Sequence, residues 1–587
     1  MQTLLQTVSH RSAMDNSEIA DKLTELANLL DISGENPFRV RSYRWAVRTI
    51  ESSTLVFEQM VRNGQRLTNV DGIGKSIADK MVEIVRTGTC AALEEARQAV
   101  NPNVIELLRL EGLGPKKVKK LHEELEIETV DELEAAILDG RLKDVAGFGG
   151  TMSEKLTKAI AHFRTGIGRF RLDSALEIGE TILDYLSEVP GIERMELAGS
   201  LRRRKESVGD LDILVICEDS DAVIGHFLSY WEVDQVLTKS SSRASVRLDF
   251  GIQVDCLVVP RESFGAAMHY FTGSQSHNIA VRARSHWPEY HISINEMGVH
   301  HRDTGDFICG ATEAEVFEAV GLRYIPPEIR ENIGEVEAAE EDRLPELVEL
   351  SDIRGDLHMH TTETDGRNTI IEMAECCQSL GYEYMAITDH SKAMAIANGL
   401  DAQRLAAQFQ EIDKANYEVD IRILRAIEVD ILRDGSLDLD DGILAECEWV
   451  IASVHSHMQI SAEEMTTRLL RAIENPNVCA IAHPTARLIL EREGYSFDTV
   501  RVFEAARDAG VCMEINANPA RLDLKDVQAR QVRELGGRLV INTDAHFLRE
   551  LYNMRFGVWT ARRGWIGPAD VLNTLSLEAL LDAKRKR

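Results

Sequence analysis

The sequence lacks the features of membrane, exported and disulfide-bonded proteins. Within its 587 residues, no apolar run approaches the roughly 20 residues that a membrane-spanning helix needs, so we expect no membrane partner. The first segment, MQTLLQTVSHRSAMDNSEIA, has no basic region followed by an apolar core, and we expect no export signal. The nine cysteines include no CxxC pair, which argues against disulfides and thiolate zinc sites. We therefore expect a cytoplasmic protein, and the length predicts several domains.

Positive charge is also scarce. The chain carries 66 Lys and Arg against 97 Asp and Glu, a formal net charge of −31. Nucleic-acid binding needs local positive charge, but a net charge is an average over the whole chain. Carboxylates gathered around metal ions also count toward that sum while they face a cation. The local patches therefore decide whether nucleic acid is a partner.

Apolar spacing predicts a helical N-terminal region followed by two regions that contain sheets. Ile19, Leu23 and Leu26 recur at helical spacing. From residue 173 a helical pattern precedes three apolar strands, RMELAGS, DLDILVICE and GIQVDCLVVP. Residues 326–350 are rich in Glu and Pro, which is typical of a linker. Beyond them, strands such as YMAITDH, WVIASVHSH and RLVINTDAH alternate with helical stretches, a pattern that predicts a barrel-like βα domain.

Three Gly-x-Gly turns recur within helical hairpins, in VDGIGKSIADKM, LEGLGPKKVKKL and VAGFGGTMSEKL. One such turn is usually just a tight helix connection, whereas three of them form an internal repeat. The free N–H groups at a helix N-terminus bind phosphate, and glycine allows its close approach. We therefore expect contacts to a nucleic-acid backbone that are blind to base sequence. The candidate residues are Gly72, Gly74, Gly112, Gly114, Lys116, Lys117, Gly147 and Gly149.

The segment AGSLRRRKESVGDLDILVI places two carboxylates one residue apart at the start of a strand. Asp210 and Asp212 therefore point to the same face of a sheet, where paired like charges are costly unless a cation lies between them. Asp255, in IQVDCLVV, lies on a second apolar strand that can pair beside the first. Three such acids suit two Mg²⁺ ions bridged by phosphate oxygens. A solvated Asp-x-Asp turn is the alternative, and the Gly-Ser turn upstream favours the metal site.

A second constellation of polar residues lies beyond residue 350, in DLHMHTTETDG, ITDHS, AIEVD, SVHSH, AIAHP and NTDAH. These residues recur at the ends of strands, where a βα barrel gathers its active-site groups. A lone histidine is more often a core residue, but nine nitrogen and oxygen ligands without a thiolate suit two or three ions of Mn, Zn or Fe. The candidates are His358, His360, Asp365, His390, Glu428, His455, His483, Asp544 and His546.

Two of these motifs resemble a known family. GSLRRRKESVGDLDIL with VDCLVV resembles the nucleotidyltransferase signature of the family X DNA polymerases, and YFTGSQSHNIAVR resembles their nucleotide-binding segment. The resemblance implies Asp210, Asp212 and Asp255 as ligands of two Mg²⁺ or Mn²⁺ ions, and dNTPs as substrates. Leu257 departs from the pattern, because many relatives are expected to carry Arg there. The implied nucleotide contacts are Ser200, Arg203 and Gly209 on the triphosphate, Tyr270, Phe271 and Gly273 along the sugar, and Asn278 and Arg282 near the base pair.

The histidine motifs resemble the PHP (polymerase and histidinol phosphatase) domain, and a PHP domain after a polymerase resembles the bacterial polymerase X enzymes. The resemblance implies a gap-filling DNA polymerase for base excision repair, acting on gapped or nicked DNA as a monomer. It also implies a metal-dependent 3′→5′ exonuclease with Mn²⁺ favoured, and abasic-site cleavage or 3′-phosphate removal as related activities. Lys80 falls where some members carry a Schiff-base lysine for a lyase activity, although a lysine on a DNA-facing helix more often contacts phosphate.

The resemblance implies a multidomain fold of helix-hairpin-helix regions, an α/β nucleotidyltransferase palm and a distorted TIM-like PHP barrel. The expected segments are a disordered extension (1–13, with Met14 as an alternative start), an N-terminal helical DNA-binding domain of the 8 kDa type (14–88), a helix-hairpin-helix domain (89–170), the palm (171–262), a nucleotide and base-pair-binding domain (263–325), a linker (326–350) and the PHP domain (351–587).

Two other classes of function remain open from the residues. The chain could be a nucleotidyltransferase for RNA or a small molecule, fused to a phosphoesterase of histidinol-phosphatase type. Three Gly-x-Gly hairpins disfavour this interpretation, because a small substrate needs no array for gripping a duplex. A DNA-end scaffold with inactive sites is opposed by the complete set of acids and metal ligands.

The repeat yields a first prediction. Changing Lys116 and Lys117 to Ala should weaken DNA binding equally on all sequences and flatten its salt dependence, by about one unit of slope for each phosphate that a lysine no longer neutralises. Fluorescence anisotropy on several unrelated duplexes, at a series of salt concentrations, measures both effects. An affinity that ignores salt, or that depends strongly on sequence, would contradict the backbone-binding interpretation.

Overall fold

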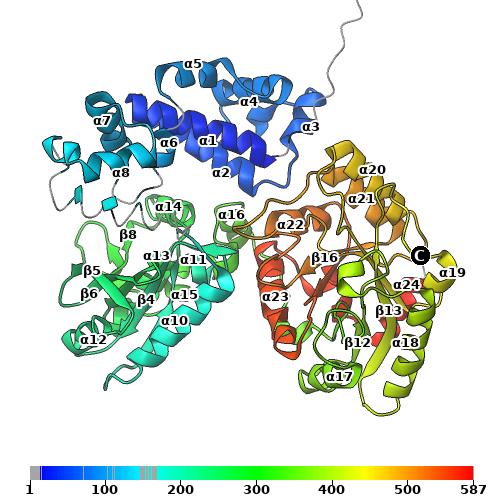
Figure 1. Ribbon diagram of the computed structural model, residues 1–587. Helices are drawn as coiled ribbons and strands as arrows, with labels where there is room; N and C mark the ends of the chain where they lie inside the picture. Colours follow the sequence, from blue (N-terminus) through cyan, green and yellow to red (C-terminus); the bar gives the residue numbers. More distant parts are fainter. Residues whose placement is uncertain are drawn as a thin grey trace, which may run out of the picture. The chain divides into compact units, whose positions relative to one another are not determined.

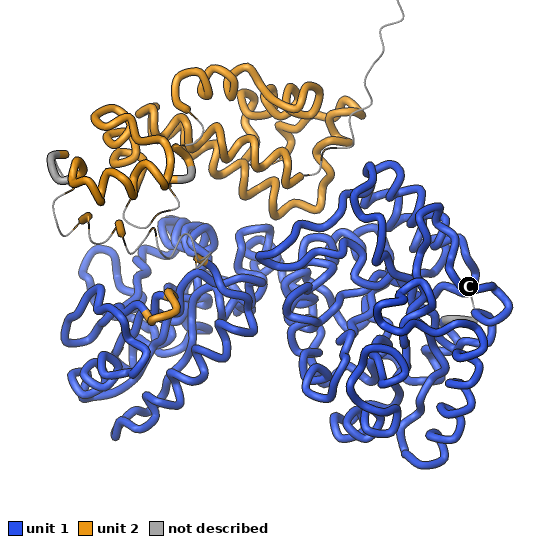
Figure 2. Tube along the Cα trace, viewed as in Figure 1, with its two compact units in different colours: residues 1–13, 169–247, 253–587 blue, residues 14–168, 248–252 orange. Residues whose placement is uncertain are grey.

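The computed structural model describes residues 14–585, except residues 15, 71, 102–103, 109, 111–112, 146–147, 149–151, 154–155, 158–159 and 161–167. The expected disordered extension at residues 1–13 therefore lies outside the described residues. The chain forms two compact units, shown in Figure 2: residues 14–168 with 248–252, and residues 169–247 with 253–587. In the part of the chain that is described, no helix is long and apolar enough to cross a membrane.

The unit of residues 14–168 is helical and is built around α1 (Figure 1). Ile19, Leu23 and Leu26 are fully buried in its core, so the predicted helix is confirmed. The helix α2 begins where the Asn36 side chain accepts a hydrogen bond from the Phe38 N–H and Pro37 opens the first turn. In chain order, the described helices of this unit are α1 (Asn16–Ser33), α2 (Pro37–Ser52), α3 (Phe57–Arg62), α4 (Lys75–Thr87), α5 (Ala91–Ala99), α6 (Val104–Leu107), α7 (Pro115–Leu125) and α8 (Val130–Leu138).

The second unit begins with a five-stranded sheet in the order β2-β4-β7-β6-β5. Its centre is the parallel pair β4 and β7, both almost entirely buried. A three-stranded antiparallel sheet follows. The strands are β1 (Phe170–Arg171), β2 (Arg194–Leu197), β3 (Ser207–Val208), β4 (Asp210–Ile216), β5 (Val233–Lys239), β6 (Arg243–Leu248), β7 (Gln253–Val258), β8 (Ile292–Asn295), β9 (Gly298–His301) and β10 (Phe307–Cys309). The helices are α10 (Leu172–Leu186), α11 (Gly199–Arg202), α12 (Ser220–Phe227), α13 (Phe264–Thr272), α14 (Gln275–Arg284), α15 (Glu313–Glu318) and α16 (Glu335–Glu340).

From residue 355 the chain forms a parallel barrel of seven strands in sequence order, β11 to β17. The barrel closes where the His360 N–H donates to the Ala545 carbonyl (2.8 Å) and the Asp544 N–H donates to the His358 carbonyl (2.9 Å). Alternate residues of β12 enter different buried clusters, one on each face of the sheet. The strands are β11 (Gly355–Asp356), β12 (Tyr384–Ile387), β13 (Arg422–Asp430), β14 (Trp449–Ser453), β15 (Ala480–Ile481), β16 (Cys512–Asn516) and β17 (Leu539–Asn542).

Helices surround the barrel strands (Figure 1). They are α17 (Ile370–Ser379), α18 (Ala402–Ala415), α19 (Asp441–Leu444), α20 (Ala462–Ile473), α21 (Thr499–Ala509), α22 (Asp526–Glu534), α23 (Met554–Arg563) and α24 (Leu577–Arg585). Four of them, α17, α18, α20 and α21, begin at a polar side chain that caps the first turn, such as Ser461, which accepts from the N–H of Glu464 at the start of α20. The alternation of strands and helices confirms the barrel that the sequence predicts.

Residues 326–350 are part of a packed core, which corrects the prediction of a linker. Ile329 and Val336 are buried with Phe317. The fully buried Glu335 accepts hydrogen bonds from the His277 ring nitrogen (2.7 Å) and from two backbone N–H groups. Arg330 is also fully buried and pairs with Glu313 at 2.6 Å. Two of the charged residues that make this segment resemble a solvated linker, Arg330 and Glu335, thus have partners inside the fold.

This correction can be tested by stability. Ile329→Ala should lower the free energy of unfolding by about 2 to 5 kcal/mol, because it leaves a cavity in the core. The matched control is Leu350→Ala, whose side chain is about half exposed and should cost less than about 0.5 kcal/mol. Denaturant unfolding of the full chain measures both. Equal, small effects would restore the linker interpretation.

Candidate active sites

The three predicted carboxylates meet on the central strand pair of the five-stranded sheet. In the parallel register of β4 and β7, Asp212 lies opposite Asp255, and Asp210 lies opposite Gln253. The Gly199 backbone has a positive φ of 63°, and a side chain there would meet the Asp212 carboxylate at 2.4 Å. Glycine at this position therefore allows the Gly-Ser turn to approach the acids closely.

The electrostatics of this triad call for a cation. Burial, together with repulsion from Asp210 and Asp255, raises the pKa of Asp212 to about 7. Burial and the Asp255 charge also raise the pKa of Asp210. Like charges gathered in a low-dielectric site favour protonation unless a positive ion compensates for them. The carboxylate oxygens are the ligand type that Mg²⁺ and Mn²⁺ prefer, so the residues present fit such ions.

Neighbouring strands hold Asp255 in place. Its carboxylate accepts hydrogen bonds from Ser245 and from Gln253 (3.0 Å), and the Arg243 guanidinium lies 3.8 Å away. None of these three partners was predicted: Ser245 and Arg243 lie on β6, which only strand pairing brings beside Asp255, whereas Gln253 lies two residues earlier on β7 itself. Leu257, where the family pattern suggests Arg, packs instead in an apolar cluster with Leu214 and Phe264.

The predicted nucleotide segment lies beside the Gly-Ser loop. Arg203 donates hydrogen bonds to the Thr272 carbonyl and to Glu331 (3.2 Å). The Asn278 side chain donates to the Tyr270 carbonyl at 2.7 Å, which ties the start of α14 to the end of α13. Of the other candidates, Ser200 is half-buried, Gly209 lies near Arg169, Phe271 packs against the Phe264 cluster, Gly273 has a positive φ beside Arg203, and Arg282 is exposed.

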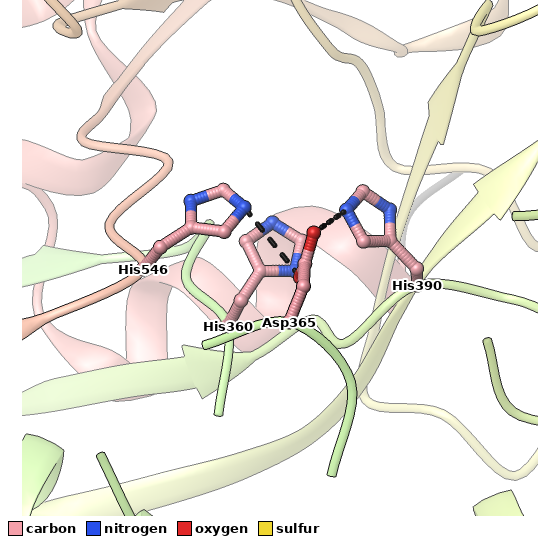
Figure 3. Close-up of side chains that lie close together, drawn as sticks. All are labelled: His360, Asp365, His390 and His546. Atoms are coloured by element: carbon pink, nitrogen blue, oxygen red, sulfur yellow. Dashed lines mark ion pairs between the residues drawn. The ribbon is translucent and has the colours of Figure 1, made fainter. Parts of the chain in front are cut away.

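The nine predicted ligands of the barrel come together at the carboxyl ends of its strands. Figure 3 shows Asp365 between His390 and His546. Its carboxylate oxygens lie 3.5 Å from His390 Nε2 and 3.6 Å from His546 Nε2. His360 belongs to the same group, in which candidate ligand atoms all lie within 4.8 Å of one another. Two further groups with this spacing are His358, His360 and Glu428, and His390, Glu428 and His455. The remaining candidates are close by: Asp544 lies 3.1 Å from His360, and His483 lies 3.1 Å from Glu428.

Glu428 is the centre of this constellation. Its carboxylate lies 2.7 Å from His390, 3.4 Å from His455 and 3.6 Å from His358. Burial alone would raise the pKa of Glu428, but the surrounding imidazoles hold it well below its usual value. A single fully buried carboxylate thus joins ligands from four strand ends, the geometry needed to bridge more than one cation.

The donor set fits divalent cations. Buried atoms that have no hydrogen-bond partner among the described residues include His358 Nε2, His360 Nδ1 and His483 Nδ1. Buried polar atoms without partners are rare in native structures and indicate a missing ion or water. A mixture of imidazole and carboxylate ligands without sulfur suits Mn²⁺, Zn²⁺ or Fe²⁺.

Comparison with known proteins places the chain in a family. It is 39% identical to the DNA polymerase/3′-5′ exonuclease PolX of Bacillus subtilis over 568 residues, which cover 96% of this chain and 98% of that protein. The chain belongs to the family X DNA polymerases that carry a PHP domain. It is also 24% identical to DNA polymerase lambda of Rattus norvegicus over 56% of this chain and 58% of that protein. A probable phosphatase of Photobacterium profundum is 30% identical over 34% of this chain and 80% of that protein.

Family models match four parts of this family X polymerase. They are a helix-hairpin-helix domain (residues 14–90), a SAM-like helix-hairpin-helix tandem (104–161), a DNA polymerase beta thumb (267–331) and a PHP domain (356–517). The expected family and fold class are therefore confirmed.

Two of the three Gly-x-Gly turns are described in part. The helix α4 begins directly after Gly74, and α7 begins directly after Gly114. Gly72 has a positive φ, and a side chain there would meet the Trp45 ring at 2.4 Å. A surface pocket of about 1040 Å³ beside α4 is lined by basic and aromatic residues that include Arg41, Trp45 and Lys75. The predicted contacts Gly112, Gly147 and Gly149 lie outside the described residues.

The predicted lysines are available to solvent. Lys116 is exposed, and Lys117 is half-buried on the first turn of α7. Lys80, on α4, donates hydrogen bonds to the Ser76 carbonyl (3.2 Å) and hydroxyl (3.1 Å). Lys80 therefore lies on the helix that directly follows the first Gly-x-Gly turn.

The structure adds a glutamate of β16 that the sequence motifs missed. Glu514 is fully buried and accepts hydrogen bonds from the His358 ring (2.8 Å), the Asn542 amide (2.9 Å) and the His483 N–H (2.7 Å). Burial would lower the pKa of His358, but Glu514, followed by Asp544 and Glu428, raises it well above its usual value. Glu514 thereby directs the other ring nitrogen of His358 toward Glu428. The one feature of the sequence that could have identified Glu514 is its charge inside the otherwise apolar strand CMEIN.

Glu514→Gln should therefore lower nuclease activity about 10- to 100-fold through weaker metal binding, the usual effect of losing a partner that orients a ligand. Primer extension should stay unchanged. Nuclease assays over a Mn²⁺ titration measure the shift, and Glu463→Gln, an exposed glutamate of α20, is the matched control. A Mn²⁺ dependence equal to that of the wild type would show that Glu514 does not orient His358.

Proposed function

We propose that this protein fills gaps in DNA during repair with its polymerase domain, and removes nucleotides from 3′ ends with its PHP domain. The observation that carries the proposal is the presence of two separate ligand constellations in one chain. One has three acids on β4 and β7, and the other has nine candidate ligands in the barrel, seven of them in clusters of ligand spacing and Asp544 and His483 beside them. The alternative, a small-molecule nucleotidyltransferase, does not account for two helix-hairpin-helix regions.

In the polymerase site, Asp210, Asp212 and Asp255 would hold two divalent cations, which supply charge neutralisation and activation of the attacking 3′-hydroxyl. The Gly-Ser turn presents N–H and hydroxyl donors beside these acids, and Arg203 adds a guanidinium. Together they would hold the triphosphate in line with the primer end. Tyr270 to Gly273 would lie along the sugar, with Asn278 and Arg282 near the base pair.

In the PHP domain, the solvent exposure of the ligand side chains indicates which side of the site is open to a substrate. Asp365 and His546 are 37% and 31% exposed, whereas Glu428, His358 and His360 are fully buried. A phosphodiester would therefore enter beside Asp365 and His546. Cations bound by the buried ligands would lower the pKa of water and so supply the nucleophile at neutral pH.

Several finer features of this function remain proposals. Mg²⁺ or Mn²⁺ is proposed for the polymerase, and Mn²⁺, Zn²⁺ or Fe for the PHP site. The proposed substrate is gapped or nicked DNA. The protein is proposed to be a monomer and to act in the cytoplasm. Abasic-site cleavage, 3′-phosphate removal and a lyase role for Lys80 are further proposals. Lys80 is supported only by its position on α4, next to the first Gly-x-Gly turn.

The two activities should separate by mutation. Asp210→Ala should lower primer extension on a one-nucleotide gap by orders of magnitude while 3′→5′ degradation persists, because it removes a ligand from one site only. His360→Ala and Asp544→Ala should have the reverse effect. Each variant is the control for the other, and circular dichroism checks the fold, since losing a metal can loosen the barrel. Intact degradation in His360→Ala would refute the nuclease assignment.

A further inference from the structure

The polymerase loop that carries Arg203 is fastened to a helix of the PHP barrel. Arg563, the last residue of α23, is 6% exposed. Its Nη1 atom donates to the Arg203 carbonyl at 2.8 Å and to the Glu331 carboxylate at 3.2 Å. Its Nη2 atom pairs with Asp526 of α22 at 2.6 Å. One buried guanidinium thus joins the barrel to the loop of the proposed triphosphate site.

The same oxygen of Glu331 serves two arginines. Glu331 Oε1 accepts from Arg203 Nε and from Arg563 Nη1, each at 3.2 Å. Burial would raise the pKa of Glu331, but Arg563, Lys205 and Arg203 together lower it, so the carboxylate stays charged. The orientation of Arg203 and the position of Arg563 are therefore linked through one charged group.

This link leaves part of Arg203 free for a ligand. Its Nε and Nη1 atoms are bonded to Glu331 and to the Thr272 carbonyl. Of the described residues, none accepts a hydrogen bond from its Nη2 atom. Two bonds of this kind restrict the rotamer of a long side chain, and a fixed guanidinium loses less entropy when it binds an oxyanion.

Two further contacts hold the same loop against the barrel. The Arg204 guanidinium stacks over the Trp559 ring of α23 at 3.8 Å. Glu206 pairs with Arg487 at 2.7 Å, on the loop that follows the PHP ligand His483. The loop is thus held by three contacts, at residues 203, 204 and 206, rather than by one ion pair.

We propose that Arg563 of the PHP barrel is a positioning residue for DNA polymerisation, which holds the Arg203 loop ready for the incoming triphosphate. The proposal rests on the proposed polymerase function. It makes the PHP domain a structural support of nucleotide binding, in addition to its own hydrolytic activity. Arg563 bonds the Arg203 carbonyl and Glu331 and none of the three polymerase acids, so it acts on the site through Glu331 and the Arg203 backbone.

The test compares single-turnover gap filling and 3′→5′ degradation in full-length Arg563→Gln. The apparent dNTP affinity should fall about tenfold, the scale of one charge-assisted hydrogen bond, with a smaller change in the maximal rate and with degradation unchanged. Arg563→Lys should recover part of the affinity. The matched control is Arg562→Gln, because Arg562 also joins α23 to the polymerase side, through Glu328 and Glu349, but does not bond Glu331 or Arg203.

Glu331→Gln provides an independent arm if Arg563→Gln does not fold. It keeps the Arg563 pair with Asp526 and should give a similar loss of dNTP affinity. When both variants fold, the double variant should lose little more than either single one. Wild-type affinity in Glu331→Gln, or equal losses in Arg562→Gln and Arg563→Gln, would overturn the proposal. An absence of gap filling by the wild type would instead refute the proposed function itself.

Discussion

The cost of burying carboxylate charge is the constraint on which both sites depend. On the polymerase sheet, three acids lie so close that burial and mutual repulsion raise the pKa of Asp212 to about 7. In the barrel, the fully buried Glu428 is surrounded by imidazoles that keep it charged. The charged surroundings of the two sites differ: near the polymerase acids the Arg243 guanidinium lies 3.8 Å from Asp255, whereas in the barrel several histidines surround the central carboxylate.

The sequence predicted those parts of the fold and the sites that depend on local periodicity. Asp210 and Asp212 lie on one face because successive strand residues alternate, and the polar residues at strand ends met in the barrel because parallel strands end at one edge. The sequence did not reveal partners that come from distant segments. Glu514 appears in the chain as a lone glutamate in an apolar strand, and only the closed barrel brings it to His358.

The linker prediction failed for a related physical reason. Composition reports how many charges a segment carries, but it does not report where their partners lie. Glu335 pairs with His277, and Arg330 pairs with Glu313, so these residues pack into the fold, although residues 340–343 are exposed. The same segment supplies Glu331, which bonds both Arg203 and Arg563. A stretch that resembles a flexible connection therefore joins the polymerase to the barrel through specific contacts.

The closure of the barrel also has a consequence for biosynthesis. The three polymerase acids have all been translated by residue 255, whereas the nuclease site needs His358 from its first strand region and Asp544 and His546 from beyond its last. A chain released early by the ribosome could therefore contain every polymerase acid and still lack nuclease ligands. Such a product would also lack Arg563, and with it the contact that holds the Arg203 loop, so both activities depend on completion of the barrel.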